Sequence, residues 1–169
     1  MTDISDLTSK DCHVVYLGLG SNLGNSQEQL GRACEKINKL IGPIVRQSAF
    51  YETEPWGFQS ENNFLNAVVC VSTHLSPRQL LRATQRIERQ LGKRKAHATE
   101  RGSQTSVEQA SSCEKTCETV APVYHDRPID IDILLYDDLH VDEPDLKIPH
   151  PLMQERDFVM VPIREIISQ

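Results

Sequence analysis

The segment from residue 129 to residue 133 reads Ile-Asp-Ile-Asp-Ile, and it constrains the fold more than any other part of the chain. Successive side chains of a β-strand point to opposite faces of the sheet. As a strand, this segment would place its three isoleucines on one face and Asp130 with Asp132 on the other. Such a strand needs a sheet with apolar cover on one face and polar groups on the other.

Further apolar segments supply the partners for such a sheet. Runs of β-branched and other apolar residues predict strands, and apolar residues at helical spacing predict helices. The predicted strands cover residues 13–19, 44–52, 64–73 and 128–136, with a short return strand at 140–141, and the predicted helices cover residues 26–41, 76–91 and 152–167. The order β-α-β-β-α-β predicts an α+β fold of the ferredoxin-like type, an antiparallel sheet with helices on one face.

Local signals mark the ends of the predicted helices. Ser26 is expected to cap the first helix. Ser76 is followed by Pro77 and then by Gln79, which together are the residues of a capping box with proline at the first helical position. Pro162 is expected to divide the last helix in two, because proline lacks the N–H that a helix interior uses.

The composition is that of one globular domain over residues 1–169, with 38% hydrophobic and 25% charged residues. Residues 96–122 are rich in Ser, Thr, Glu, Gln and Lys and predict a flexible polar insertion. No apolar run approaches the ~20 residues that span a bilayer. The N-terminus has no apolar core of a signal peptide, so we expect a cytoplasmic protein, and we expect it to be a monomer.

Charge and cysteine usage argue against two further classes, proteins that bind nucleic acid non-specifically and proteins that bind zinc. The formal net charge of −6 argues against non-specific binding of nucleic acid, which needs a surplus of Lys and Arg. The chain has five cysteines, and Cys113 and Cys117 lie four positions apart in a polar stretch. A zinc site would need two more ligands at suitable spacing, so reduced thiols are the expected state.

The acidic pair has two interpretations when its spacing is considered alone. The strand rise would put the Cα atoms of Asp130 and Asp132 about 6.5–7 Å apart, and two such carboxylates favour a cation beside them. Magnesium suits oxygen ligands and substrate phosphates, and Arg127 adds a cation of the kind that binds phosphate. An ordinary amphipathic strand with a solvated polar face explains the same pattern.

A glycine-rich segment at residues 18–24 also stays open. It follows a predicted strand, as phosphate-binding loops do, but Leu23 stands where the dinucleotide pattern needs glycine, and no P-loop lysine follows. A tight strand-to-helix turn is the commoner use of Gly and Asn in this position.

Short motifs extend along nearly the whole chain outside the insertion and the first dozen residues. They are Leu19-Gly20-Ser21-Asn22-Leu23-Gly24, residues 48–57, Phe64-Leu65-Asn66-Ala67, Gln85-Arg86-Ile87-Glu88, Leu91-Gly92-Lys93, residues 127–134, Ile148-Pro149-His150-Pro151, and Glu155-Arg156 with Phe158-Val159. In this order they resemble the 6-hydroxymethyl-7,8-dihydropterin pyrophosphokinases of folate biosynthesis, whose fold is ferredoxin-like.

The resemblance implies transfer of a pyrophosphoryl group from ATP to the hydroxymethyl-dihydropterin, with release of AMP. It implies that Asp130 and Asp132 bind two magnesium ions, and that Arg127 joins them as the third catalytic residue. The residues it assigns to ATP are Gln85, Glu88, Lys93, Tyr124, Arg127, Ile133, His150 and Arg156. The residues it assigns to the pterin are Thr53, Glu54, Trp56, Phe64, Asn66 and Phe158.

Two positions depart from the family pattern. Lys93 stands where members often have arginine, and residues 123–126 replace an Arg-Trp-Gly-Pro motif, with Tyr124 as a candidate for the missing aromatic cover. Arg94 or Arg101 could supply a second arginine of that loop. Two other functions stay in view: a nucleotidyltransferase with an Asp-x-Asp strand, and a non-catalytic ferredoxin-like module that binds a ligand.

Overall fold

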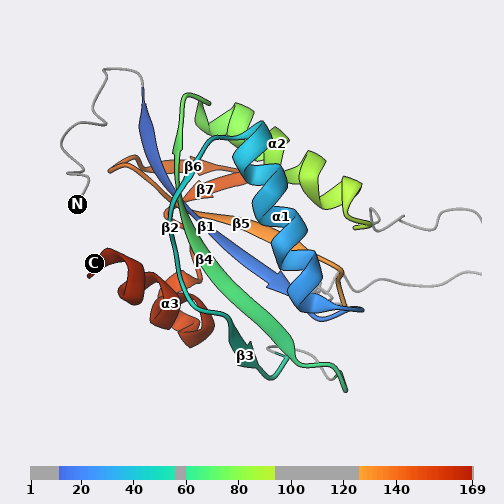
Figure 1. Cartoon of the computed structure of the whole chain (residues 1–169). Helices are drawn as coiled ribbons and strands as arrows, with labels where there is room; N and C mark the ends of the chain where they lie inside the picture. Colours follow the sequence, from blue (N-terminus) through green and yellow to red (C-terminus); the bar gives the residue numbers. More distant parts are fainter. Residues whose placement is uncertain (1–11, 56–59, 94–125, 169) are drawn as a thin grey trace, which may run out of the picture.

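One antiparallel sheet forms the middle layer of the molecule (Figure 1). The computed structural model describes residues 12–55, 60–93 and 126–168, and within these ranges the sheet has five strands. They are β1 (His13–Ser21), β2 (Ile44–Gln47), β3 (Tyr51–Thr53), β4 (Phe64–Thr73) and β5 (Asp130–Tyr136). The order is β2-β4-β1-β5 with β3 also beside β4, and each of these pairs is antiparallel. This arrangement confirms the predicted α+β fold of the ferredoxin-like type.

Helices cover both faces of this sheet, which corrects the expectation of helices on one face (Figure 1). The helices α1 (Ser26–Leu40) and α2 (Pro77–Gln90) lie on one face, and α3 (Asp157–Ile167) lies on the other. The physical reason is β4, whose residues from 66 onward are buried whichever way they point, so both sides of that strand need apolar cover.

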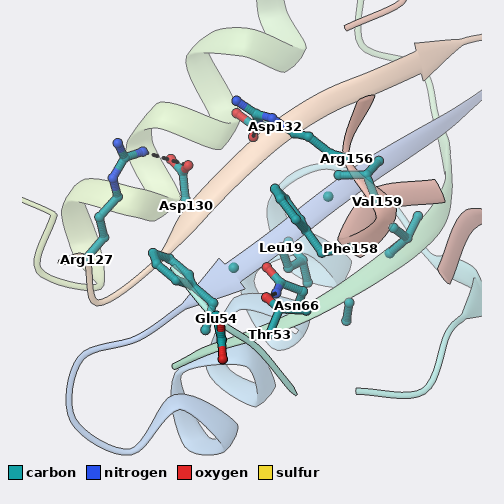
Figure 2. Close-up of a pocket in the computed structure, with 15 residues that line it drawn as sticks. Leu19, Thr53, Glu54, Asn66, Arg127, Asp130, Asp132, Arg156, Phe158 and Val159 are labelled. Atoms are coloured by element: carbon teal, nitrogen blue, oxygen red, sulfur yellow. Dashed lines mark hydrogen bonds and ion pairs between the residues drawn. The ribbon is translucent and has the colours of Figure 1, made fainter. Parts of the chain in front are cut away.

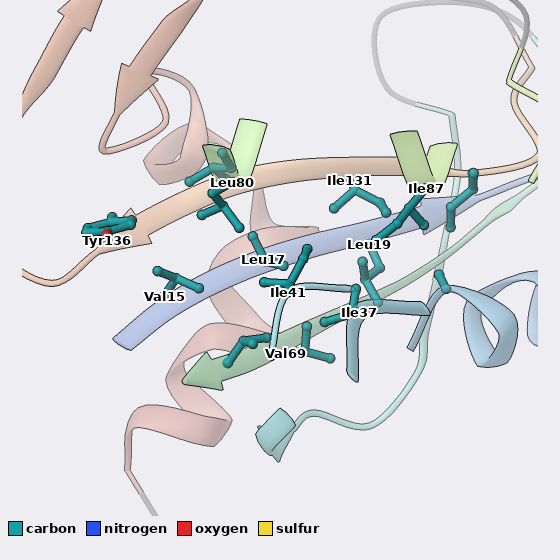
Figure 3. Packing of buried hydrophobic residues seen from close by; sticks show 14 of the residues in the cluster. Val15, Leu17, Leu19, Ile37, Ile41, Val69, Leu80, Ile87, Ile131 and Tyr136 are labelled. Carbon is teal, nitrogen blue, oxygen red and sulfur yellow. The ribbon is translucent and has the colours of Figure 1, made fainter. Parts of the chain in front are cut away.

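The larger core lies between the sheet and the helices α1 and α2. Ile37 of α1 and Leu80 of α2 are fully buried and pack with Leu17 of β1 and Ile131 of β5 (Figure 3). Ile129, Ile131 and Ile133 all belong to this cluster, so the alternation read from the sequence is confirmed. A smaller cluster under α3 contains Val68, Cys70, Leu134, Met153, Val159, Ile163 and Ile166.

The helix N-termini were predicted with mixed success. The capping box is confirmed, because the Gln79 amide donates to Ser76 Oγ (3.4 Å) and the Ser76 amide donates to Gln79 Oε1 (2.9 Å). The expected cap at Ser26 is wrong by one residue. Asn25 has the extended backbone of a cap, and its Oδ1 accepts from the Glu28 amide at 3.2 Å, so Ser26 is the first helical residue.

The C-terminal third differs from expectation in two places. The return strand is β6 (Val141–Glu143), which pairs with β7 (Leu146–Ile148) in a separate two-stranded sheet. The last helical region is divided, but the division is at Arg156, between a 3-10 turn (Met153–Glu155) and α3. Pro162 lies inside α3, so the break follows the extended backbone of Arg156 and not the proline. None of the described helices is long and apolar enough to cross a membrane.

Candidate active site

Two glycines of β1 form the floor of a pocket on the α3 side of the sheet. Gly20 lies between Asp130 of β5 and Asn66 of β4, and Gly18 lies beside Asp132. The sequence suggested a tight turn here, but β1 continues to Ser21, so both glycines are strand residues. A Cβ atom at Gly20 would lie 3.1 Å from Oδ1 of Asn66. Glycine therefore keeps the floor open between the acidic pair and the asparagine.

The pocket collects side chains from strands and from α3 (Figure 2). Its lining residues are Gly18, Leu19, Gly20, Thr53, Glu54, Phe64, Asn66, Ala67, Val68, Arg127, Asp130, Asp132, Arg156, Phe158 and Val159. Nine of these were predicted from the sequence as site residues. The structure thus brings together segments that are about a hundred residues apart along the chain.

Both carboxylate oxygens of Asp130 are held by cationic side chains. Nζ of Lys93 lies 2.6 Å from Oδ1, and Nη1 of Arg127 lies 2.7 Å from Oδ2 (Figure 2 marks the second pair). Burial acts to raise the pKa of Asp130, but the charges of Lys93 and Arg127 outweigh it and hold that pKa below its usual value. Asp130 is therefore ionised at neutral pH, with its charge balanced by the protein.

Asp132 has a much weaker partner. Nη1 of Arg156 lies 4.0 Å from its Oδ2. Burial, and then the negative charge of Asp130, raise the pKa of Asp132 to about 7, and Arg156 opposes this shift only in part. The second carboxylate therefore carries an incompletely balanced charge, which a bound cation would stabilise.

Glu88 of α2 lies beneath the acidic pair and joins the helix to β5. It is 7% exposed, its Oε1 accepts from the Ile131 amide (2.8 Å), and the same oxygen accepts from Nζ of Lys93 (2.7 Å). Burial raises the pKa of Glu88, and the lysine charge opposes that shift. Helical spacing showed that Glu88 and Gln85 are near each other, but Gln85 is exposed and Glu88 is buried.

Aromatic rings and an amide line the other end of the pocket. Phe64 begins β4, and Phe158 comes from the first turn of α3 (Figure 2 labels Phe158). Between them Nδ2 of Asn66 donates to Oγ1 of Thr53 at 2.7 Å. The guanidinium carbon of Arg156 lies 5.6 Å from the centre of the Phe158 ring. This end can hold a flat ring by its faces and bind its edge by hydrogen bonds.

A second pocket lies along the free edge of β5. Its lining includes Asp132, Ile133 and His150, so it adjoins the first pocket at Asp132. The Ile131 amide points away from β1, toward Glu88, and amides two positions apart on a strand point the same way. The Ile133 amide therefore faces this second pocket. Burial, helped by the charge of Arg156, lowers the pKa of His150, so its ring is neutral at neutral pH.

Several predictions made from the sequence lie outside the described residues. They concern Trp56, Tyr124, Arg94 and Arg101, the insertion at 96–122, and the pair Cys113 and Cys117. Cys12, Cys34 and Cys70 are free thiols. Among the described residues, no cluster of three or more His, Cys, Asp or Glu side chains could hold a metal ion by itself. A metal at the acidic pair would therefore take further ligands from substrate and water.

Comparison with known proteins gives consistent results. The family model described as 7,8-dihydro-6-hydroxymethylpterin-pyrophosphokinase (HPPK) matches residues 16–105 and 97–168. A 2-amino-4-hydroxy-6-hydroxymethyldihydropteridine pyrophosphokinase of Porphyromonas gingivalis is 43% identical over 154 residues, which cover 90% of each chain. The enzyme of the same name in Aquifex aeolicus is 34% identical over 152 residues, covering 90% of this chain and 79% of the relative.

Solved structures agree on the fold. An HPPK-DHPS chain of Plasmodium falciparum superimposes with a TM-score of 0.65 at 16% identity, over 95% of this chain and 43% of the other. The chain thus spans less than half of that longer protein. From the family model and the two relatives together, this chain belongs to the 7,8-dihydro-6-hydroxymethylpterin-pyrophosphokinase family.

Proposed function

We propose that this chain transfers the pyrophosphoryl group of ATP to the hydroxymethyl group of 6-hydroxymethyl-7,8-dihydropterin, with release of AMP, as a step in folate biosynthesis. The observation that carries the proposal is one pocket with a slot between aromatic side chains at one end and the pair Asp130 and Asp132 with Arg127 at the other. A flat heterocycle with a short hydroxymethyl arm fits this combination, because the ring needs the slot and the arm must reach the charged groups.

At the pterin end, Phe64 and Phe158 would contact the two faces of the ring. Asn66 and Thr53 already form a hydrogen bond across the pocket wall, and each has polar groups for the ring edge. Glu54 lines the same wall. The ring would thereby be held with its hydroxymethyl arm directed along β1 toward Asp130.

The acidic pair fits magnesium by its donor chemistry. Asp130 and Asp132 offer only oxygen ligands, and the pKa of Asp132, raised to about 7, reports a negative charge that the protein balances incompletely. We propose that these two residues hold two magnesium ions. When bound, magnesium supplies charge neutralisation for the phosphates and orients the reacting oxygens.

On the ATP side, the chain itself supplies cations. Lys93 and Arg127 are within 2.7 Å of Asp130, where they can also reach phosphate oxygens next to the acidic pair. The hydroxymethyl oxygen of the pterin bonds to the β-phosphorus and gives up its proton to water. The bond from the β-phosphorus to the oxygen shared with the α-phosphate breaks, and AMP leaves with that oxygen. The two side chains stabilise the charge that develops on the phosphates.

The second pocket is the proposed place of the nucleoside. Its wall has the Ile133 amide as a hydrogen-bond donor, the neutral His150 ring, and Leu81 as an apolar surface. It adjoins the first pocket at Asp132, and Arg156 lines that first pocket close to Asp132. We further propose one domain over residues 1–169, because the described helices pack on the two faces of one sheet. We also propose that it acts in the cytoplasm as a monomer.

The direct test is the identity of the nucleotide product. We expect AMP, in equal amount to pterin diphosphate, when the protein is incubated with ATP, magnesium and 6-hydroxymethyl-7,8-dihydropterin. Anion-exchange chromatography separates the products. Free pyrophosphate would instead indicate a nucleotidyltransferase, ADP would indicate an ordinary kinase, and pterin binding without turnover would indicate a binding module.

Gly20→Ala tests the floor of the pocket. We expect pterin binding to weaken by about ten- to a hundredfold, because the new methyl group would push Oδ1 of Asn66 from its place and disturb its hydrogen bonding. Calorimetric titration with the pterin measures the change. Gly31→Ala is the matched control, since nothing lies within 4 Å of its added Cβ. Equal pterin affinity in both variants would contradict the assignment.

A further inference from the structure

Asn22, the first residue after β1, is a buried polar residue outside both pockets. It is 4% exposed. Its backbone amide donates to the carbonyl oxygen of Arg127 (3.1 Å), and its side-chain Oδ1 accepts from the Arg127 amide (2.7 Å). One asparagine thus binds both backbone groups of a residue that is 105 positions away in the sequence.

The other end of the Asn22 amide joins a second segment through Asp126. Nδ2 of Asn22 donates to Oδ1 of Asp126 (2.7 Å), and Nδ2 of Asn62 donates to Oδ2 of the same carboxylate (3.3 Å). Nδ2 of Asn22 also reaches the carbonyl oxygen of Asn62 at 3.5 Å. Asn22, Asn62 and Asp126 form one network, which we call the Asn22 network.

The Asn22 network touches both ends of the active-site pocket indirectly. On one side it holds the backbone of Arg127, whose guanidinium binds Asp130. On the other side it holds Asn62, two residues before Phe64 at the pocket wall. A buried amide is costly unless its groups are bonded, and Asn22 uses both ends of its side chain.

We propose that Asn22 and Asp126 are positioning residues that set the arginine of the phosphate side and the aromatic wall of the pterin side relative to each other. Neither residue touches a substrate in this proposal. Its catalytic part rests on the function proposed above, in which Arg127 acts on phosphates and Phe64 on the ring. The proposal predicts that the hydrogen-bond donor at position 22 and the acceptor at position 126 depend on each other. Changing one alone should disturb the site, and exchanging both should be tolerated.

An exchange of the two side-chain types tests this pairing. Asn22→Asp keeps an acceptor for the Arg127 amide, but it removes the donor and sets a second carboxylate against Asp126. Asp126→Asn in the same protein restores a donor toward the new carboxylate and an acceptor toward Asn62. The double variant can therefore satisfy every bond of the network except the long 3.5 Å contact.

We expect Asn22→Asp to lower kcat by about tenfold or more, because small displacements of positioned groups have effects of this size. We expect KM for both substrates to change less than kcat. The double variant Asn22→Asp/Asp126→Asn should recover to within about threefold of wild type, as coupled residues do in a double-mutant cycle. A double variant whose loss equals the product of the two single losses would overturn the proposal.

Asn38→Asp is the matched control. Asn38 is exposed at the end of α1, and its Oδ1 accepts from the Ile44 amide, so the same substitution keeps its hydrogen bond far from the site. We expect its kcat within about twofold of wild type, as for most surface substitutions. A loss like that of Asn22→Asp would mean that the substitution type, and not the network, causes the effect.

A second measurement tests the network without depending on turnover. In ¹⁵N–¹H spectra without substrate, Asn22→Asp should shift the amide signals of Arg127 and Asp130 and also those of Asn63 and Phe64, and the double variant should return both sets toward wild type. Shifts confined to the neighbours of residue 22 would overturn the coupling. If Asn22→Asp does not fold, Asp126→Asn alone must shift both sets. A wild-type protein that forms no AMP would reject the proposed function, while these spectra still decide the coupling.

Discussion

Asp132→Asn is expected to lower the rate of AMP formation by about a thousandfold or more, the scale of losing a charge-stabilising group in phosphoryl transfer. Asparagine keeps the size of the side chain but removes its charge, so the acidic pair would retain only Asp130. The charge of Asp130 is already shared with Lys93 and Arg127, so Asp130 alone offers a bound cation much less negative charge than the pair does. Initial rates at saturating ATP, magnesium and pterin measure the effect.

Asp138→Asn provides the matched control for this substitution. Asp138 is an exposed residue in the turn after β5, and it lines neither the first nor the second pocket. Its variant should keep the wild-type rate. Wild-type-like turnover in Asp132→Asn would reject the proposed metal site, and loss of turnover in both variants would point to a general effect on the fold.

Asp132→Asn should also be more stable than the wild-type protein at alkaline pH in magnesium-free buffer. The folded-state pKa of Asp132 is raised to about 7 from an ordinary value near 3.8, so the folded protein binds more protons than the unfolded chain between these values. Stability is therefore lost as pH rises toward 7. The side chain is 39% exposed, and solvent screening reduces the expected gain to about 1 kcal/mol at pH 8. Urea unfolding at pH 4 and pH 8 measures it, and an equal difference at both values would contradict the charge explanation.

Gly42→Ala is expected to have the largest effect on stability, with a loss of about 4 kcal/mol or more. Gly42 follows α1 with a φ of 155°, and an added Cβ would lie 2.0 Å from the backbone oxygen of Ser72. The backbone of residue 42 fixes the position of the Cβ, and the backbone of β4 fixes the oxygen, so no side-chain rotation relieves the clash. The connection between α1 and β2 would have to move away from β4.

The matched substitution Gly31→Ala lies inside α1, where nothing is within 4 Å of the added Cβ. We expect it to raise the free energy of unfolding by about 0.5–1 kcal/mol, since alanine favours helix. Thermal and urea unfolding compare the two variants. A Gly42→Ala protein as stable as wild type would show that the chain can shift freely at this connection.

Much of this fold could be predicted from the sequence, because its strands and helix ends depend on interactions between residues close together along the chain. The alternation at residues 129–133 reflects the pleat of one strand, and the capping box at Ser76 is complete within four residues. Packing faces depend on distant parts of the chain. The position of α3 follows from β4 being buried on both sides, and a run of apolar residues does not state which helix covers which side.

The sequence identified those candidate site residues whose side-chain type by itself suggests a function. Asp130, Asp132 and Phe158 were identified and do line one pocket. Gly20 was read as turn chemistry, because glycine signals a turn and an absent side chain equally well. Asn22 was noted as part of a turn and of a family motif, but without a role of its own. Its hydrogen bonds span 105 positions, and no local pattern carries such a link.

The two faces of β5 give each position along the strand a separate role. Residues 130 and 132 face the pocket, and residues 129, 131 and 133 face the core under α1 and α2. One residue inserted ahead of this stretch would exchange the two sets, placing isoleucines in the pocket and carboxylates against the helices. Even and odd positions thus meet different requirements, and the register of this one strand sets both the packing of the core and the place of the acidic pair.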